Sequence, residues 1–328
     1  MGRMPIGFLY RCENAPENLP AYARLVERAG YDELWVVEDC FFTGAVSAAA
    51  VALACTERLR VGIGILPAAF RNPALAAMEL ANLCRLFPGR VLPGFGHGVG
   101  GWLEQVGAAH PSPLAVLGET VQAVRALLAG ETVTVDGRYA RLTDVALEFP
   151  PAQVPPLSLG VRAERSMRLS GRVADGTILA EGASPAYIGW AREMIDEGRR
   201  EAGRSDDHRL TVYVDFEFDP DRRTARREIA IRLAGGRLQP GDAELADELA
   251  VLTAATSDVD GLAAALPEAW VDRFAMAGTA EQCLAAYDRI GAAGADAIVL
   301  RPPTDPQLAV AQITLAADEL LPTLRTRS

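Results

Sequence analysis

The stretch RVGIGILPAAFRNP, residues 60–73, begins as a β-strand and then interrupts its own pattern. Gly62 and Gly64 stand inside the apolar run, and Pro67 and Pro73 bracket the loop that follows. Glycine inside a strand weakens it and usually marks a bulge, or a place where another group approaches the backbone. The stretch therefore predicts a strand that is bulged at Gly64 and leads through a loop into a helix.

Similar apolar runs recur along the whole chain and alternate with helical patterns. The strands are expected to begin near residues 5, 33, 60, 90, 155, 176, 209 and 296. Apolar strands joined by helices indicate a parallel sheet. Eight such units predict an α/β fold of the (β/α)8 TIM-barrel type, as one domain over residues 1–328. A doubly wound open sheet is the alternative, and the strand count weighs against it.

Two stretches interrupt the alternation of strands and helices and are expected to be insertions in the barrel. The first, about 131–152, reads as a β-hairpin that turns at Asp136–Gly137. The second, about 220–278, reads mostly as charged helix.

Charge and composition exclude several classes of function. The formal net charge is -11, which disfavours nucleic acid and acidic membranes, because binding them needs a positive field. The chain contains no lysine, so Schiff-base chemistry and a P-loop lysine are excluded. His97, His110 and His208 lie far apart and form no metal-ligand pattern, so we expect no metal site.

The cysteines and the apolar runs indicate the compartment. The five cysteines are scattered and include no Cys-x-x-Cys pair, which suits a reducing cytoplasm. No apolar run is long enough for a membrane span, and the first residues do not match a secretory signal. We therefore expect a cytoplasmic protein without a membrane partner.

Active sites of such barrels lie at the carboxyl ends of the strands, which shortens the search for chemistry. Glu38 and Asp39 follow the second strand, where they could carry a proton or instead cap a helix that starts near Thr43. His97 stands between Gly96 and Gly98 after the fourth strand. It is a second candidate for proton transfer, unless it is a loop histidine bonded to the backbone.

Two glycine-containing stretches suggest a bound cofactor. GHGVGG, residues 96–101, matches G-x-G-x-x-G, but the helix after it is too short for a dinucleotide site. Its glycines could instead let a flat ring lie against the backbone. In GVRAERS, residues 160–166, a strand ends just before a helix begins, so free amides together with Arg162 and Arg165 predict a phosphate site. Both arginines could otherwise simply solvate the helix.

Together these stretches resemble the luciferase-like flavin and deazaflavin oxidoreductases. The likeness is greatest to the coenzyme F420-dependent subgroup, which includes methylene-tetrahydromethanopterin reductases. It is carried, in order along the chain, by residues 26–39, 56–83, 89–98, 137–151, 159–176 and 277–300.

The resemblance implies a cofactor site on three segments. It implies a cis peptide at Gly64–Ile65 that backs the cofactor ring, so that the glycines there make room for the ring. The implied cofactor-binding residues are Gly64, Ile65, Leu66, Gly96, His97, Gly98, Gly160, Val161, Arg162, Ala163, Glu164, Arg165 and Ser166. Relatives are commonly dimers, so a homodimer is expected, and helices 45–55 and 74–87 could supply its interface.

The chain also departs from the family pattern at three places. Leu66-Pro67 stands where relatives often have Thr-Asn, and Glu38-Asp39 where they often have Asp-His. Ala163-Glu164 replaces Gly-Pro in the phosphate segment, and a glutamate is unhelpful beside a phosphate.

The leading hypothesis is an F420-dependent oxidoreductase that transfers a hydride between the deazaflavin and a small organic substrate. Glu38, Asp39 or His97 would move the accompanying proton. The alternatives are a luciferase-like monooxygenase that uses FMN and dioxygen, and a cofactor-free, non-catalytic barrel or partner subunit.

Overall fold

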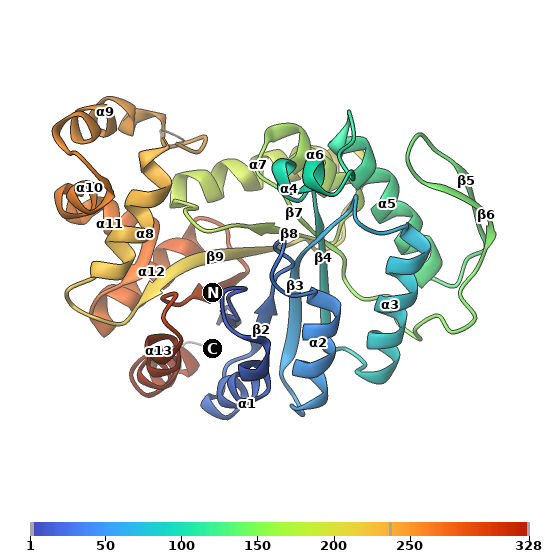
Figure 1. Ribbon diagram of the computed structural model, residues 1–328, viewed down its shortest axis with the longest axis horizontal. Helices are drawn as coiled ribbons and strands as arrows, with labels where there is room; N and C mark the ends of the chain where they lie inside the picture. Colours follow the sequence, from blue (N-terminus) through green and yellow to red (C-terminus); the bar gives the residue numbers. More distant parts are fainter. Residues whose placement is uncertain (1–2, 236–237, 327–328) are drawn as a thin grey trace.

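Eight parallel strands close into a barrel in the computed structural model, which describes residues 3–235 and 238–326. The ring closes because β8 pairs with β9, in the order β9-β11-β1-β2-β3-β4-β7-β8 (Figure 1). The strands are β1 (Ile6–Leu9), β2 (Glu33–Val36), β3 (Arg60–Pro67), β4 (Val91–Gly96), β7 (Ser158–Gly160), β8 (Gly176–Leu179), β9 (Arg209–Glu217) and β11 (Ala297–Arg301). The predicted (β/α)8 barrel is confirmed, and the open-sheet alternative is wrong.

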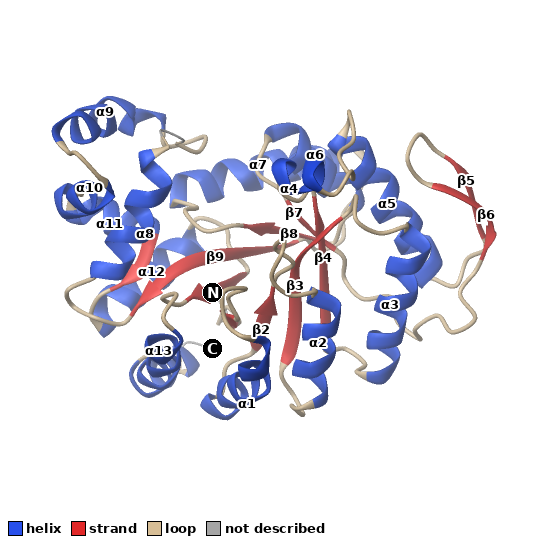
Figure 2. Cartoon of the chain, viewed as in Figure 1, coloured by secondary structure: helices blue, strands red, loops and turns tan. Residues whose placement is uncertain are grey.

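Helices surround the barrel, as the blue ribbons around the red strands show in Figure 2. The main ones are α1 (Leu19–Ala29), α2 (Ala45–Ala54), α3 (Pro73–Leu86), α5 (Pro113–Leu128), α6 (Glu164–Val173), α7 (Pro185–Glu201), α12 (Ala280–Ala292) and α13 (Pro306–Glu319). Short elements are the 3-10 turn η1 (Pro16–Asn18), α4 (Gly100–Gln105) and α14 (Leu321–Arg325). Local sequence fixes several ends: the Asn72 side chain accepts from the Ala74 N–H, and Thr279 forms a capping box with Gln282.

Both insertions lie at the periphery of the barrel, at opposite ends of the long axis in Figure 1. The first is the hairpin of β5 (Val133–Asp136) and β6 (Arg141–Val145), which turns after Asp136 as predicted. The second contains α8 (Arg223–Ala234), the 3-10 turn η2 (Ala243–Leu245), α9 (Ala246–Ala255), α10 (Val259–Ala265), α11 (Glu268–Phe274) and β10 (Ala275–Ala277). Strand β10, which the sequence did not indicate, pairs with the end of β9.

Three apolar clusters hold these layers together. The largest lies between the strands and the surrounding helices. The second insertion has its own cluster, with Ile229, Leu262 and Trp270 among its members. The barrel interior is filled by Leu9, Trp35, Leu92, Ile178, Tyr213 and Val299. Of the predicted domain 1–328, residues 1–2, 236–237 and 327–328 lie outside the described residues.

Strand β3 is irregular where the sequence predicted a bulge. The register between β3 and β4 shifts between Ile63 and Leu66, and the Gly64–Ile65 peptide is cis. The bulge and the cis bond that the resemblance implied are both confirmed. The Cys40–Phe41 peptide is also cis, which the sequence did not indicate.

Candidate functional site

A cavity of about 530 Å³ opens at the carboxyl ends of the barrel strands. Every barrel strand, or the segment after it, contributes to the wall. The lining residues are Leu9, Arg11, Cys12, Glu13, Val37, Glu38, Asp39, Gly64, Ile65, His97, Gly98, Val99, Trp102, Gly160, Val161, Arg162, Ala163, Ser166, Ile178, Ala180, Glu181, Tyr213 and Arg301. The sequence predicted the active site at this edge of the barrel.

Four of the residues proposed for the cofactor lie outside this lining: Leu66, Gly96, Glu164 and Arg165. Leu66 is 1% exposed and packs in the core between sheet and helices. Glu164 and Arg165 are exposed at the start of α6, where Glu164 forms an ion pair with Arg168 at 3.3 Å. Leu66 faces the layer between the sheet and the helices, and Glu164 and Arg165 face solvent at the first turn of α6.

Gly96, the fourth residue outside the lining, serves the packing of Ile65. A β-carbon at Gly96 would lie 2.8 Å from both the Gly160 carbonyl oxygen and Ile65 Cγ1. A β-carbon at Gly160 would also press against the Ile65 side chain. The two glycines therefore leave the space that the Ile65 side chain fills, and the cofactor role expected for Gly96 stays a prediction.

The glycines of β3 make room for two aromatic side chains of the barrel interior. A β-carbon at Gly62 would overlap the Trp35 indole, and one at Gly64 would overlap the Tyr213 hydroxyl. The resemblance implied only that these glycines make room for the cofactor ring. Close packing within the barrel itself already requires them.

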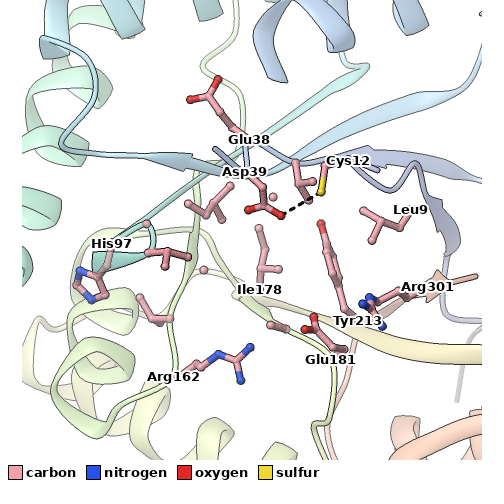
Figure 3. A pocket seen from close by; sticks show the side chains of 18 of the residues that line it. Leu9, Cys12, Glu38, Asp39, His97, Arg162, Ile178, Glu181, Tyr213 and Arg301 are labelled. Carbon is pink, nitrogen blue, oxygen red and sulfur yellow. Dashed lines mark hydrogen bonds between the residues drawn. The ribbon is translucent and has the colours of Figure 1, made fainter. Parts of the chain in front are cut away.

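Glu38 is engaged by neighbouring protein groups. Arg71 donates to both of its carboxylate oxygens, with Nη2 at 2.7 Å from Oε2. The Ala45 N–H also donates to Oε2 at 3.1 Å, so Glu38 caps the start of α2. In Figure 3 its carboxylate points away from the centre of the cavity. This is the helix-cap alternative that the sequence left open.

Asp39 faces the cavity beside Cys12, as the dashed line in Figure 3 shows. The Cys12 thiol donates to Asp39 Oδ2 at 3.5 Å. Burial raises the pKa of the Asp39 carboxyl, and the negative charges of Glu181 and Glu13 raise it further. Asp39 is therefore a carboxyl group at the cavity wall whose pKa is raised.

His97 lies on the opposite side of the cavity from Tyr213 and Arg301 (Figure 3). Its Nε2 is 3.0 Å from Ser166 Oγ in the first turn of α6. Burial lowers the pKa of His97, which keeps the imidazole neutral near pH 7.

The amino end of α6 reaches the same part of the cavity. Ala163 precedes the helix, and no side chain caps its amides. Arg162 lines the cavity and forms no ion pair with the described residues. A helix start with free amides and a nearby guanidinium favours an anion.

Tyr213, Glu181 and Arg301 line the cavity but were not predicted as site residues. Tyr213 stands in the middle of β9, and only its inward alternation could have indicated it. Its side chain is 4% exposed, and its hydroxyl has no hydrogen-bond partner within residues 3–235 and 238–326. Burial raises the pKa of Tyr213 well above its ordinary value.

Two other kinds of site are absent from the part of the chain that the structure describes. That part contains no group of three His, Cys, Asp or Glu side chains able to hold a metal ion. Each of its helices is too short or too polar to cross a membrane.

Comparisons with known proteins agree with this architecture. A family model described as "Luciferase-like monooxygenase" matches residues 4–297. The 5,10-methylenetetrahydromethanopterin reductase of Methanolobus tindarius is 26% identical over 297 residues, covering 87% of this chain and 90% of that protein. The F420-dependent glucose-6-phosphate dehydrogenase of Microbacterium testaceum is 30% identical over 241 residues, 68% of this chain and 71% of that protein.

A solved structure has the same fold over nearly the whole chain. It is the coenzyme F420-dependent tetrahydromethanopterin reductase of Methanopyrus kandleri, with a TM-score of 0.84 and 20% identity. The match covers 98% of this chain and 100% of that one.

Proposed function

This chain belongs to the luciferase-like monooxygenase family, and on that premise we propose that it is an oxidoreductase that binds coenzyme F420 at the barrel mouth. In this proposal a hydride passes between the deazaflavin and a small organic substrate. Two of the relatives above support the choice of cofactor, because the names of one dehydrogenase and of one solved reductase include F420.

One observation carries the proposal: the Gly64–Ile65 bulge and the amino end of α6 line the same cavity. The bulge offers backbone and the Ile65 side chain as a wall for a planar ring. The α6 amides, Arg162 and Ser166 offer donors for a phosphate. When bound, a deazaflavin supplies the hydride chemistry, and the protein supplies binding, orientation and exclusion of water.

The charge at the α6 end fits an anion despite Glu164. The Glu164 carboxylate is exposed and bound by Arg168, outside the cavity lining. Arg162 therefore remains as the charged side chain on this wall, beside the neutral pair of His97 and Ser166.

We assign the proton-transfer role to Asp39. Of the three candidates it faces the cavity with a raised pKa, which suits a group that holds and releases a proton. Glu38 is held as an ion pair with Arg71, and His97 is bonded to Ser166 at the α6 end.

We also propose that the protein works as a homodimer in a reducing cytoplasm. All five cysteines are free, which supports a reducing compartment.

The decisive experiment is a fluorescence titration of the purified protein with coenzyme F420 and, in parallel, with FMN. We expect saturable binding of F420 and much weaker binding of FMN. A preference for FMN, with oxygen consumption when reduced flavin is supplied, would replace the proposal by the monooxygenase alternative. Binding of neither cofactor would favour the non-catalytic barrel.

The same preparation tests the role of Asp39. Asp39→Asn should lower turnover by about 100-fold while the affinity for F420 stays within a factor of about two. Glu104→Gln, which removes an exposed carboxylate of α4, is the control and should leave both quantities unchanged. Full activity of Asp39→Asn would remove Asp39 from the mechanism.

A further inference from the structure

The end of the cavity away from the amides of α6 contains two carboxylates without an ion-pair partner among the described residues. We call this region the acidic end and define it by four lining residues, Asp39, Glu181, Tyr213 and Cys12. In Figure 3 Asp39 and Cys12 lie near the hydroxyl tip of Tyr213, and Glu181 lies near the other end of that side chain, between Arg162 and Arg301. Neither Asp39 nor Glu181 forms an ion pair with any residue that the structure describes. Two carboxylates at one wall of a half-enclosed cavity are unfavourable without a compensating cation.

The arginines of this wall already form ion pairs with other carboxylates. Arg301 Nη1 binds Asp215 Oδ1 at 2.7 Å and Glu228 Oε2 at 2.9 Å. These two bonds hold the Arg301 guanidinium, so it attracts Glu181 and Asp39 without touching them.

Arg11 also forms ion pairs with carboxylates. Its Nη2 binds Glu13 Oε1 at 2.8 Å, and its Nη1 lies 3.6 Å from Glu228. Arg232 adds a further cation, but it binds Asp215. Three arginines therefore meet three carboxylates in this network, and none of these arginines forms an ion pair with Asp39 or Glu181.

Tyr213 provides a second and independent sign that a ligand belongs here. Tyr213 lines the cavity, and its hydroxyl, which points towards Asp39 and Cys12 in Figure 3, is buried and lacks a hydrogen-bond partner among the described residues. A buried hydroxyl without a partner costs about 1–3 kcal/mol, so such groups are rare unless something else bonds to them. The phenol oxygen can accept a hydrogen bond from an N–H group that the two carboxylates attract.

We propose that the substrate bears a positively charged nitrogen next to its reacting carbon and binds at the acidic end through Asp39, Glu181 and the Tyr213 hydroxyl. Iminium ions and protonated amines are the two redox forms of such a substrate. This inference rests on the proposed function, because it assigns the α6 end of the cavity to the cofactor.

The redox step balances with a reduced deazaflavin as the reductant. A hydride forms a C–H bond at the iminium carbon, and the C=N π electron pair moves onto nitrogen. The reductant gives up one hydride and one proton and becomes oxidised, and the proton ends on the amine nitrogen. The product is a protonated amine, so the positive charge stays beside Asp39 and Glu181 throughout.

The same charges exclude phosphorylated substrates from this end. A phosphate ester would bring negative charge beside two unpaired carboxylates, while Arg11 and Arg301 are occupied. This chain is therefore expected to reject glucose 6-phosphate, although a relative is named for that substrate.

Calorimetric titration with two probes of the same shape tests the proposal. Tetrahydroisoquinoline is a cation at pH 7, and isochroman is its neutral oxygen analogue. Titrated into the full chain, with and without coenzyme F420, the cation should bind at least about tenfold more tightly than isochroman. With coenzyme F420 occupying the α6 end, glucose 6-phosphate should give no binding.

Variants identify the groups responsible. The double variant Asp39→Asn/Glu181→Gln should abolish the preference for the cation and leave the affinity for isochroman unchanged. Tyr213→Phe should weaken binding of the cation by about fivefold, the effect of one hydrogen bond. Glu104→Gln, an exposed carboxylate outside the cavity lining, should keep the full preference.

The outcomes separate this inference from the proposed function. Equal binding of the two probes, or a preference that survives in the double variant, overturns the inference while F420 binding can still stand. Binding of glucose 6-phosphate as tight as that of the cation overturns it as well. A cation preference without F420 binding would instead keep the acidic end and overturn the cofactor proposal.

Discussion

Burial is the main cause of the lowered pKa of His97 and of His208. Burial lowers the pKa of both imidazoles. For His208 the pKa falls to about 4, with Arg192, Arg199 and Arg204 lowering it further after burial. His208 Nε2 lies 2.8 Å from Thr177 Oγ1, which in turn lies 2.7 Å from Ser170 Oγ. These three side chains form a buried polar chain.

His208 should make the stability of the protein depend on pH. In the unfolded chain its pKa is about 6.5, so the unfolded state takes up the proton first as the pH falls. The contribution of His208 to stability is complete above pH 6.5 and is lost as the pH falls from 6.5 towards about 4. The full loss corresponds to about 3 kcal/mol.

Urea unfolding of the wild type and of His208→Gln, from pH 7.5 to pH 4.5, measures this effect. Other titrating groups are common to both proteins, so the wild type should lose more stability than the variant over this range. Parallel stability curves for the two proteins would show that His208 does not carry the effect.

At the scale of elements, the β3 bulge and β9 are fitted to each other. The Tyr213 ring rises from β9 until its hydroxyl occupies the space where a β-carbon of residue 64 would be. The bulge on one strand thus depends on a side chain from a strand on the far side of the barrel. Trp35 of β2 lies edge to face with Tyr213, at 5.7 Å between ring centroids, and completes this contact.

Gly64→Ala should lower the free energy of unfolding by about 2 kcal/mol, because the new methyl group collides with the Tyr213 hydroxyl. In a Tyr213→Phe background the cost should fall to about 1 kcal/mol, since the oxygen is gone and Cζ lies 3.1 Å away. Tyr213→Phe alone should not destabilise the protein, because its hydroxyl has no hydrogen bond to lose.

Chemical denaturation of the four proteins of this cycle gives the coupling directly. Gly62→Ala is the matched control: its methyl group meets the Trp35 indole, so Tyr213→Phe should not relieve its cost. If Gly64→Ala costs the same in both backgrounds, the fit between bulge and hydroxyl is not what constrains Gly64.

At the scale of the whole molecule, α3 leaves an apolar stripe uncovered. Leu75, Met78 and Leu86 are exposed on one face of this helix, and Val51 is exposed on the neighbouring α2. Exposed apolar patches on a folded chain often mark an interface between proteins. The stripe supports the homodimer that the resemblance implied, with α2 and α3 as its interface.

Light scattering should therefore give a mass of twice the 34.9 kDa of one chain. Met78→Glu places a charge in the stripe and should shift the protein towards monomer while its circular dichroism is unchanged. Val310→Glu adds the same charge at an exposed apolar site on α13 and should remain dimeric. A monomeric wild type would contradict the dimer, whatever the variants do.

The sequence by itself determined the eight barrel strands, their helices, the hairpin and the bulge at Gly64. These depend on periodicity, caps and glycine positions, which are local properties of the backbone and can be read along the chain. The same local rule placed Glu38, Asp39, His97 and the α6 segment at one edge of the barrel.

Only the tertiary structure decided which of these groups are free to act. Arg71 reaches Glu38 from a later loop, Ile65 fills the space beside Gly96, and Tyr213 occupies the space beside Gly64. Arg301 likewise meets Asp215 and Glu228 only when β9 and β11 pair in the closed barrel. Charge pairing and steric fit act through space between segments far apart in sequence, so no pattern along the chain contains them.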